Sequence, residues 1–213
     1  MLVGMLIGVL GLISFTYQTY TKNISMTGNV VNTRLSIIVT QSSECSFHLY
    51  KGWNLVSFYC IGMAVHRDKV LESINDSYQK IFYYDASDSS DHWKSYDKDL
   101  PDWTVQQLNY MDRVSAYWIY MNNEADYYYN GSKRSSVISL VPGWNFVGYP
   151  SKTNNTISFA MSGVMFNIMK TYDSSSSIYF VYDNSSMSNS LDTLETYKGY
   201  WVNSSAYQSW NVN

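Results

Sequence analysis

The chain has few of the residues that build metal centres or nucleic-acid interfaces. Its 213 residues include three His and two Cys, too few for a multi-ligand zinc or iron–sulfur site. Charged residues make up 15% of the chain, against about 25% in an average soluble domain. The net charge is −3 and there is no basic block. Nucleic-acid binding needs clustered Lys and Arg that displace counterions, so we expect no nucleic-acid partner.

Signatures of catalysis are also missing. The sequence contains no G-x-S-x-G elbow, no H-E-x-x-H, no phosphate-binding loop and no dinucleotide-binding glycine pattern. His48, His66 and His92 lie in different predicted elements, so each is expected to be solvated or structural. Cys45 and Cys60 have no neighbouring His in a protease pattern. We therefore predict that the chain is not an enzyme.

Aromatic and other hydrophobic residues are abundant. Hydrophobic residues make up 46% of the chain, aromatic residues 17%, and 21 residues are Tyr. This composition argues against general disorder. A chain of this length can bury a substantial core without help from metals or many disulfides.

The first 13 residues are all Met, Leu, Val, Ile or Gly, which predicts a hydrophobic helix over residues 1–20. A membrane-spanning helix needs about 20 apolar residues, and a signal-peptide core about 7 to 15. The alternatives are an uncleaved short anchor, which we favour, a cleaved signal and a buried core helix. Gly4, Gly8 and Gly11 would lie on one side of this helix and allow close helix packing, although small residues are common in all such segments.

If the chain is exported, it can form a disulfide and carry glycans. Cys45 and Cys60 lie 15 residues apart and flank a strand-like stretch. Outside the cell they can form a disulfide, which closes a loop worth about 3 kcal/mol in the chain-entropy model; the alternative is two separate buried thiols. Six N-x-[ST] patterns are possible glycosylation sites, although chance matches are common in a chain rich in Ser and Asn. They are Asn23, Asn75, Asn130, Asn154, Asn184 and Asn203.

Internal duplication is the most informative pattern. Four blocks recur in the same order: 49–59 as 140–150, 81–85 as 179–183, 105–108 as 191–194, and 117–119 as 200–202. The Gly-Trp-Asn of the first block suggests a tight turn followed by a strand, with the Asn facing away from the Trp or turning back to cap the turn. Because Trp53, Trp144, Trp118 and Trp201 recur by position, we expect them to anchor two equivalent cores.

These patterns predict a mainly β protein with short helices (α+β). Each repeat is expected to be a small antiparallel sheet with one or two helical turns, at 66–74 and 156–161, where apolar residues are three and four apart. The expected organisation is a hydrophobic helix over 1–20, a leading strand segment over 21–45, and β-rich repeats over 46–136 and 137–213.

Two groups of side chains are candidate binding sites. Asp85, Asp88 and Asp91 offer closely spaced oxygen ligands for calcium, the one cofactor considered; the alternative is a solvated acidic loop. Tyr127, Tyr128 and Tyr129 could form a platform that stacks on sugar rings, or could belong to the core.

The repeats resemble the GWN-type module of archaeal secreted and surface-layer-associated proteins. Its signature is G-W-N-L-[IV]-S-[FY]-P near the start and L-x-x-L-x-x-G-x-G-Y-W-[IV] near the end. The second repeat matches best, through 143–145, Tyr149-Pro150, Leu191-x-x-Leu194 and 198–202. The first repeat has Tyr59 in place of Pro, and Ser115-Ala116 in place of the Gly before Tyr117. The resemblance covers about 47–213.

That resemblance implies an extracellular scaffolding or adhesion role and brings no shared active site with it. The first forty residues are also similar to those of archaeal anchored surface proteins. We therefore expect a membrane-associated structural protein at the cell surface. It would be a self-associating subunit of a surface layer or filament, assembled through the N-terminal helix and strand and through repeat packing. The alternative is a glycan- or protein-binding adhesion module anchored at the cell surface.

Overall fold

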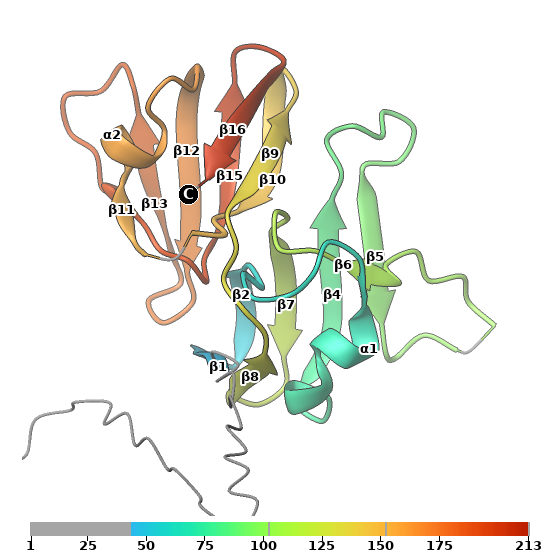
Figure 1. The fold of residues 1–213 in the computed structure, drawn as a ribbon. Helices are drawn as coiled ribbons and strands as arrows, with labels where there is room; N and C mark the ends of the chain where they lie inside the picture. The colour runs from blue at the N-terminus through green and yellow to red at the C-terminus, as the bar shows by residue number, and fades with distance from the viewer. Residues whose placement is uncertain (1–43, 102, 152, 213) are drawn as a thin grey trace, which may run out of the picture. The chain divides into compact units, whose positions relative to one another are not determined.

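A computed structural model describes residues 44–101, 103–151 and 153–212 (Figure 1). The predicted helix over 1–20 with Gly4, Gly8 and Gly11, the site at Asn23 and nearly all of the segment 21–45 lie outside these residues. Among the described residues, no helix has the length and apolar character needed to cross a membrane. Gln41–Asn213 forms one compact unit. We call its strands β1–β8 the first half and β9–β16 the second half.

The first half is built around a four-stranded antiparallel sheet (Figure 1). Its order is β2 (Gly52–Val56), β7 (Tyr117–Met121), β4 (Tyr78–Tyr84) and β5 (Trp93–Asp97). Two antiparallel pairs accompany it: β1 (Glu44–Leu49) with β8 (Ala125–Asn130), and β3 (Val65–His66) with β6 (Tyr110–Met111). The short helices are α1 (Arg67–Val70) and the 3-10 helix η1 (Glu72–Ile74), within the stretch where helical turns were predicted.

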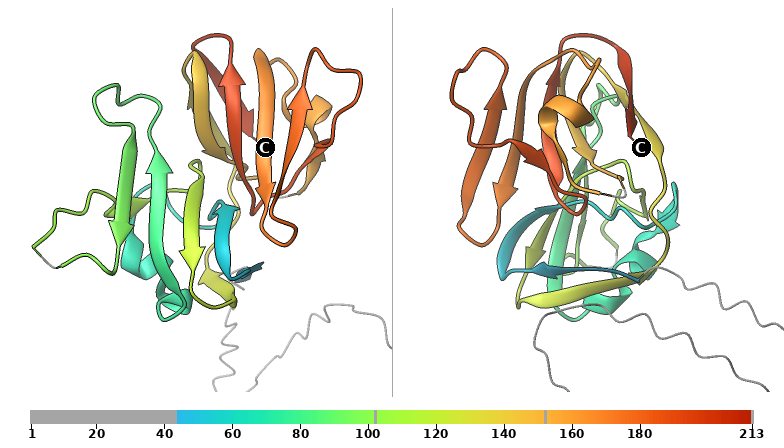
Figure 2. Two further views of the ribbon diagram at one scale, coloured as in Figure 1. Left: turned by 180° about the vertical axis from the view of Figure 1, so that it is seen from behind. Right: turned by 60° about the vertical axis from the view of Figure 1, so that its left-hand side comes forward.

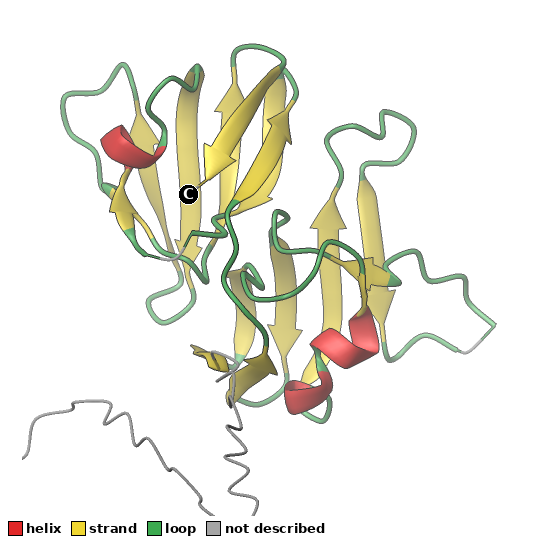
Figure 3. Ribbon diagram, in the orientation of Figure 1, coloured by secondary structure: helices red, strands yellow, loops and turns green. Residues whose placement is uncertain are grey.

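The second half has the same pairings in the same order (Figure 2). Its four-stranded sheet runs β10 (Gly143–Gly148), β15 (Gly199–Ser204), β12 (Phe166–Asp173) and β13 (Ile178–Asp183). The pairs are β9 (Ser136–Leu140) with β16 (Gln208–Val212), and β11 (Asn155–Thr156) with β14 (Thr193–Leu194). The helix α2 spans Ile157–Ala160. The predicted class is confirmed: antiparallel β-sheets with a few short helices (Figure 3).

Strand order corrects two of the four sequence matches. Block 81–85 lies in and just after β4, whose counterpart by pairing is β12, whereas the matched block 179–183 lies in β13. Leu108 corresponds to Leu191, because the two backbone N–H groups donate to equivalent strand carbonyls, those of Ser95 and Val181. That match was therefore three residues out of register. Similar runs of Tyr, Phe and Asp on neighbouring strands of one sheet explain the first error.

The turn before each sheet is fixed by the Gly-Trp-Asn block. Gly52 and Gly143 have φ of 93° and 94°, which a residue with a Cβ rarely adopts. The Asn54 side chain accepts a hydrogen bond from Tyr50 N at 2.9 Å and donates to Tyr50 O at 2.7 Å. Asn145 makes the same two bonds to Val141, at 2.9 and 2.8 Å. Of the two orientations considered for these Asn side chains, the capping one is present.

The outer edges of the two large sheets are covered by the chain itself. In the first half, Ser95 O accepts hydrogen bonds from Gln107 N and Leu108 N, and the Gln106 side chain bonds both N and O of Asp97. In the second half the loop before β14 covers β13 in the same way: Val181 O accepts from 190 and 191, and Asp183 N donates to Asn189. Occupied edge groups disfavour the addition of a further strand at β5 or β13.

The two halves meet through main-chain contacts, which include two short hydrogen bonds and two isolated β-bridges. Ser57 N donates to Tyr197 O and Gly148 N donates to Val114 O, both at 2.8 Å. Isolated bridges join Val56 to Lys198 and Ser115 to Val147. Exchanging the two halves turns each of these hydrogen bonds into the other, and each bridge into the other. This is the property of a two-fold, isologous interface.

Glycine makes this approach possible. A Cβ at Gly148 would lie 2.7 Å from Ser57 Cβ, and one at Gly199 would lie 2.8 Å from Ala116 Cβ. Both distances are shorter than non-bonded carbon atoms tolerate, and main-chain carbonyls at 2.9–3.0 Å limit any movement.

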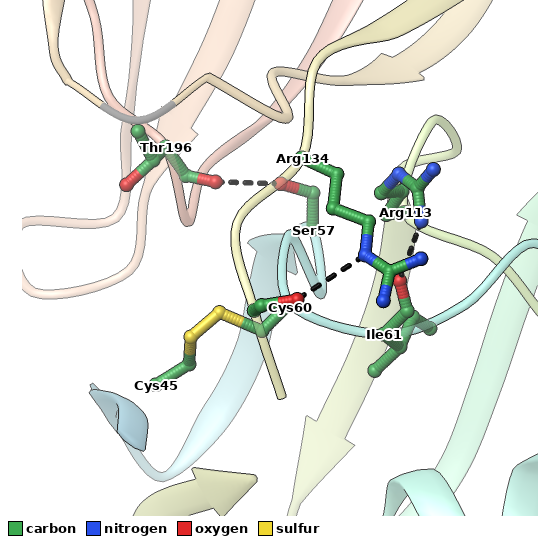
Figure 4. The surroundings of a disulfide bond; sticks show 8 residues. Cys45, Ser57, Cys60, Ile61, Arg113, Arg134 and Thr196 are labelled. Atoms are coloured by element: carbon green, nitrogen blue, oxygen red, sulfur yellow. Dashed lines mark hydrogen bonds between the residues drawn. A yellow bond between two sulfur atoms is a disulfide. The ribbon is translucent and has the colours of Figure 1, made fainter. Parts of the chain in front are cut away.

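A disulfide between Cys45 and Cys60 secures the first half beside this junction (Figure 4). The bond ties β1 to the loop after β2, as the 15-residue spacing allowed. In the same loop Ser57 Oγ donates to Thr196 O at 3.1 Å, and Arg113 donates to Ile61 O at 3.1 Å. The disulfide therefore holds the loop that carries one side of the contact between the halves.

The junction predicts the effect of two substitutions. Gly148→Ala and Gly199→Ala should each lower the free energy of unfolding by about 1–3 kcal/mol, because the added methyl group overpacks a main-chain contact. Urea denaturation followed by Trp fluorescence measures the loss. Ser139→Ala, on the exposed face of β9, is the control and should change little. Unchanged stability in both glycine variants would contradict the junction described.

Candidate functional site

Strand alternation divides the first sheet into a core face and a second face. Tyr117, Ile119 and Met121 of β7 are buried in the core of the first half, together with Ile81 of β4. The alternate residues point to the other side, because successive side chains of a strand project from opposite faces. On that side are Trp53, Leu55, Lys80, Phe82, Tyr84, Trp93, Ser95, Asp97, Trp118 and Tyr120.

An aromatic groove of about 580 Å³ lies against this second face. Its lining comes from both halves, since the β12–β13 hairpin adds two Tyr that face each other across the strand pair. The lining residues are Trp53, Phe82, Trp93, Ser95, Trp118, Tyr172 and Tyr179, which we call the aromatic groove. Its volume falls within the range of ligand sites, roughly 300–1,000 Å³.

The groove rings stand at steep angles to one another. Trp53 and Trp118 have centroids 6.2 Å apart with planes at 87°, and Trp118 meets Tyr172 at 5.2 Å and 60°. Tyr172 and Tyr179 lie 5.2 Å apart at 61°. Edge-to-face packing of this kind holds the rings in place without stacking their faces against each other. The groove thus has fixed aromatic walls.

The lining carries no charged side chain, and ion pairs lie beside it. Lys80 and Asp97 form the next cross-strand pair on the same face as Phe82 and Ser95. Lys80 Nζ lies 3.4 Å from Asp97 Oδ2. Burial raises the pKa of the Tyr179 hydroxyl, with a smaller contribution from Tyr172, so Tyr179 is protonated at neutral pH. The arrangement can bind a neutral group with apolar faces; it contains no nucleophile–base pair.

The prediction that four Trp residues fill the two cores is wrong. Trp53 is 40% exposed and Trp144 is 37% exposed, whereas Trp118 and Trp201 are half-buried and pack against a third cluster, formed by Leu55, Ala116 and Phe146. The core-facing residues of these blocks are Asn54, Asn145, Tyr117 and Tyr200. Three hydrogen bonds to the adjoining turn allow each Asn to be buried.

The recurring Trp residues nevertheless have matching neighbours. Trp144 meets Trp201 at 6.4 Å and 90°, as Trp53 meets Trp118 at 6.2 Å and 87°. Tyr117 and Tyr200 also play the same part, since each hydroxyl accepts a hydrogen bond from the backbone N–H five residues earlier. These positions therefore have equivalent surroundings in the two halves, although the predicted side of the sheet was wrong for Trp53 and Trp144.

Two of the three candidate calcium ligands contact a lysine. Lys94 Nζ lies 2.8 Å from Asp88 and 3.4 Å from Asp91, while Asp85 accepts hydrogen bonds from Ser87. Hydrogen bonds from Lys94 and Ser90 lower the pKa of Asp88. The described part of the chain holds no group of three or more His, Cys, Asp or Glu placed to bind a metal ion.

The three His lie apart, as expected. His48 contacts Asp126 at 2.8 Å, His66 accepts from Asp68 N at the start of α1, and His92 contacts Asp85 O at 2.8 Å. The Tyr127–Tyr129 platform does not form. Tyr127 is buried at 1% exposure and Tyr129 packs against the same core, whereas Tyr128 points to the opposite face of β8 and is exposed.

The possible glycosylation sites fall into two groups within the described residues. Asn75, Asn130, Asn154 and Asn184 are exposed. Asn203 lies inside β15, is half-buried, and accepts a hydrogen bond from the Asn167 side chain at 3.0 Å. Asn203 is therefore less accessible to glycan attachment than the four exposed sites.

Five groove residues were missed by sequence reasoning: Phe82, Trp93, Ser95, Tyr172 and Tyr179. Trp93 stood in a segment taken for an acidic loop, yet Trp93-Lys-Ser-Tyr-Asp97 forms β5. Its alternation of Trp93 and Ser95 with Lys94 and Tyr96 was the available signal. The contribution of β12 and β13 had no local signal, because it depends on how the halves meet.

Comparison with known protein families, curated proteins and solved structures finds no match to this chain. The groove must therefore be interpreted from its own residues.

The position of Trp53 predicts a modest contribution to stability. Trp53→Ala should cost about 1–2 kcal/mol, because a half-exposed ring loses only part of the energy of full burial. Trp210→Ala should cost about 3–5 kcal/mol, since that ring is buried against Tyr149 and donates to Ala160 O. Urea denaturation of both variants checks the difference. Equal losses would return Trp53 to a core role.

Proposed function

We propose that this chain is an extracellular, surface-associated adhesion module without catalytic activity, and that it binds an external ligand in the aromatic groove. The observation that carries the proposal is the groove itself: half-exposed Trp and Tyr rings held at fixed angles at the meeting of the two halves. Aromatic side chains that are partly exposed in a concave site are typical of ligand binding. The Cys45–Cys60 disulfide supports an oxidising, extracellular location.

The shared strand pairing supports descent of the two halves from one duplicated unit, of the kind that the GWN resemblance implies. Equivalent turns at Gly52 and Gly143, and equivalent junction contacts, favour copying over chance. On this proposal the groove arose where two copies packed together. The N-terminal apolar segment would attach the module to the membrane.

Binding to the cell envelope tests this function. The full chain is incubated with insoluble envelope material, and the retained fraction is measured after washing. Trp53→Ala and Tyr179→Ala should each reduce retention at least roughly tenfold, the effect of about 1.4 kcal/mol. Tyr207→Ala, which removes a ring that is 79% exposed and lies outside the groove, is the matched control. Retention that both groove variants leave unchanged contradicts the proposal.

A second candidate, a structural subunit of a surface layer or filament, is favoured by one observation. The loop between β5 and β6 exposes Trp103 at 84% and Val105 at 87%. Apolar side chains at a loop tip are a common means of contact between protein copies. With β5 and β13 covered at their outer edges, assembly by this route would use the loop rather than those strand edges.

Particle size tests the structural role. The full chain should form ordered polymers in electron micrographs and a high mass by light scattering. The double variant Trp103→Ser, Val105→Ser should form smaller particles. Tyr207→Ser, which changes an exposed residue elsewhere, should form particles of the wild-type size. A wild-type chain that stays monomeric at all concentrations excludes the subunit role.

A further inference from the structure

We infer that the aromatic groove binds a neutral glycan, with one site per chain; this inference rests on the proposed binding role of the groove. A pyranose ring has apolar faces and hydroxyl groups around its edge. The site for such a ring must therefore combine an uncharged aromatic surface with polar donors and acceptors at its border.

The aromatic surface is present and unstacked. Within the groove the planes of neighbouring rings meet at 50–87°, so none of these pairs is parallel. Trp53, Trp93 and Tyr179 each keep a large exposed fraction. Each of these three rings contacts at least two other aromatic rings, which reduces its conformational freedom and so lowers the entropy cost of binding.

The border supplies the polar groups. Lys80 and Asp97 lie on the same sheet face as Phe82 and Ser95, one cross-strand pair further along. They offer an ammonium donor and a carboxylate acceptor beside the rings, paired at 3.4 Å and both partly buried. The Gln106 side chain bonds both N and O of Asp97, at 3.1 and 2.8 Å, and so fixes the position of the strand there.

Charge selects against other ligands. No charged side chain lines the groove, so an acidic ligand would lose hydration there without a paired cation. Lys80 does not offer a free positive charge, since Asp97 neutralises it. A quaternary ammonium group is the one charged ligand that aromatic walls attract without an acidic residue. It is a separate chemical class and serves as a comparison in the test.

The equivalent place in the second half is closed. Leu55 is paired with Trp118, and its counterpart paired with Trp201 is Phe146. Phe146 stacks on Trp201 with centroids 4.4 Å apart and planes at 29°. The counterpart of Phe82 is Lys170, whose Nζ lies 5.3 Å from the Trp144 ring centre. The larger Phe and the charged Lys therefore fill the position that is open in the first half, which gives one site per chain.

Calorimetric titration of the full chain tests this inference. Neutral gluco-, manno- and galacto-oligosaccharides are compared with oligouronates and with tetramethylammonium chloride. We expect at least one neutral series to bind with a stoichiometry of one and the oligouronates to bind at least roughly tenfold more weakly. Trp53→Ala and Tyr179→Ala should each weaken binding by a similar factor, and Asp97→Asn should weaken it without loss of folding.

Trp144→Ala is the matched control, because Trp144 is the counterpart of Trp53 on the closed side. It should leave binding unchanged. Binding that is lost in Trp144→Ala and kept in Trp53→Ala overturns the inference. Tetramethylammonium binding without sugar binding also overturns it, as does the absence of sugar binding while envelope retention still depends on Trp53. In the last two cases the proposed adhesion role survives; if retention is also independent of Trp53, both proposals fail.

Discussion

Close main-chain contact between the halves brings together the groove residues that the two halves contribute. Ser57 faces Gly148 and Ala116 faces Gly199, with no room for a further methyl group at either glycine. Hydrogen bonds to Tyr197 O and Val114 O accompany this contact, so backbone atoms hold the halves together in addition to the side-chain cluster of Leu55, Ala116 and Phe146. The β12–β13 hairpin is thereby brought to the face of the first sheet. Without that placement, Tyr172 and Tyr179 would not reach Trp53 and Trp118.

In each large sheet, the side chains of one face form the core and those of the other face form the surface on which the groove or its counterpart lies. One face of β7 supplies Tyr117, Ile119 and Met121 to the core, and the other presents Trp118. The same division holds in β15, where Tyr200 and Val202 are buried and Trp201 packs at the junction. A side chain on the second face can change without opening a cavity in either core. This independence is consistent with divergence of the two halves at Leu55 and Phe146 while their cores stayed alike.

The sequence allowed the fold class, the turns at Gly52 and Gly143, the short helices and the Cys45–Cys60 pair to be predicted. These features are local, or depend on residue spacing alone. The face on which Trp53 lies could not be assigned. In its strand Trp and Leu occupy one set of alternate positions, and Asn and Val occupy the other, so both faces carry apolar residues. The outcome depended on Asn54, whose burial is possible only because the preceding turn offers hydrogen-bond partners. The groove required the junction as well, and a contact between residues 90 positions apart leaves no trace in local periodicity.

Both glycines at the junction belong to the second half, and both larger partners belong to the first. The two halves are therefore not interchangeable. In a chain made of two second halves, glycine would face glycine at the junction, and the two halves would fit. In a chain made of two first halves, Ser would face Ser and Ala would face Ala, and these side chains would clash. If the halves diverged from one parent, that parent carried the smaller residues. At each of these two positions, a larger residue could then be accepted in only one of the halves. The other half had to keep glycine, because two side chains would not fit.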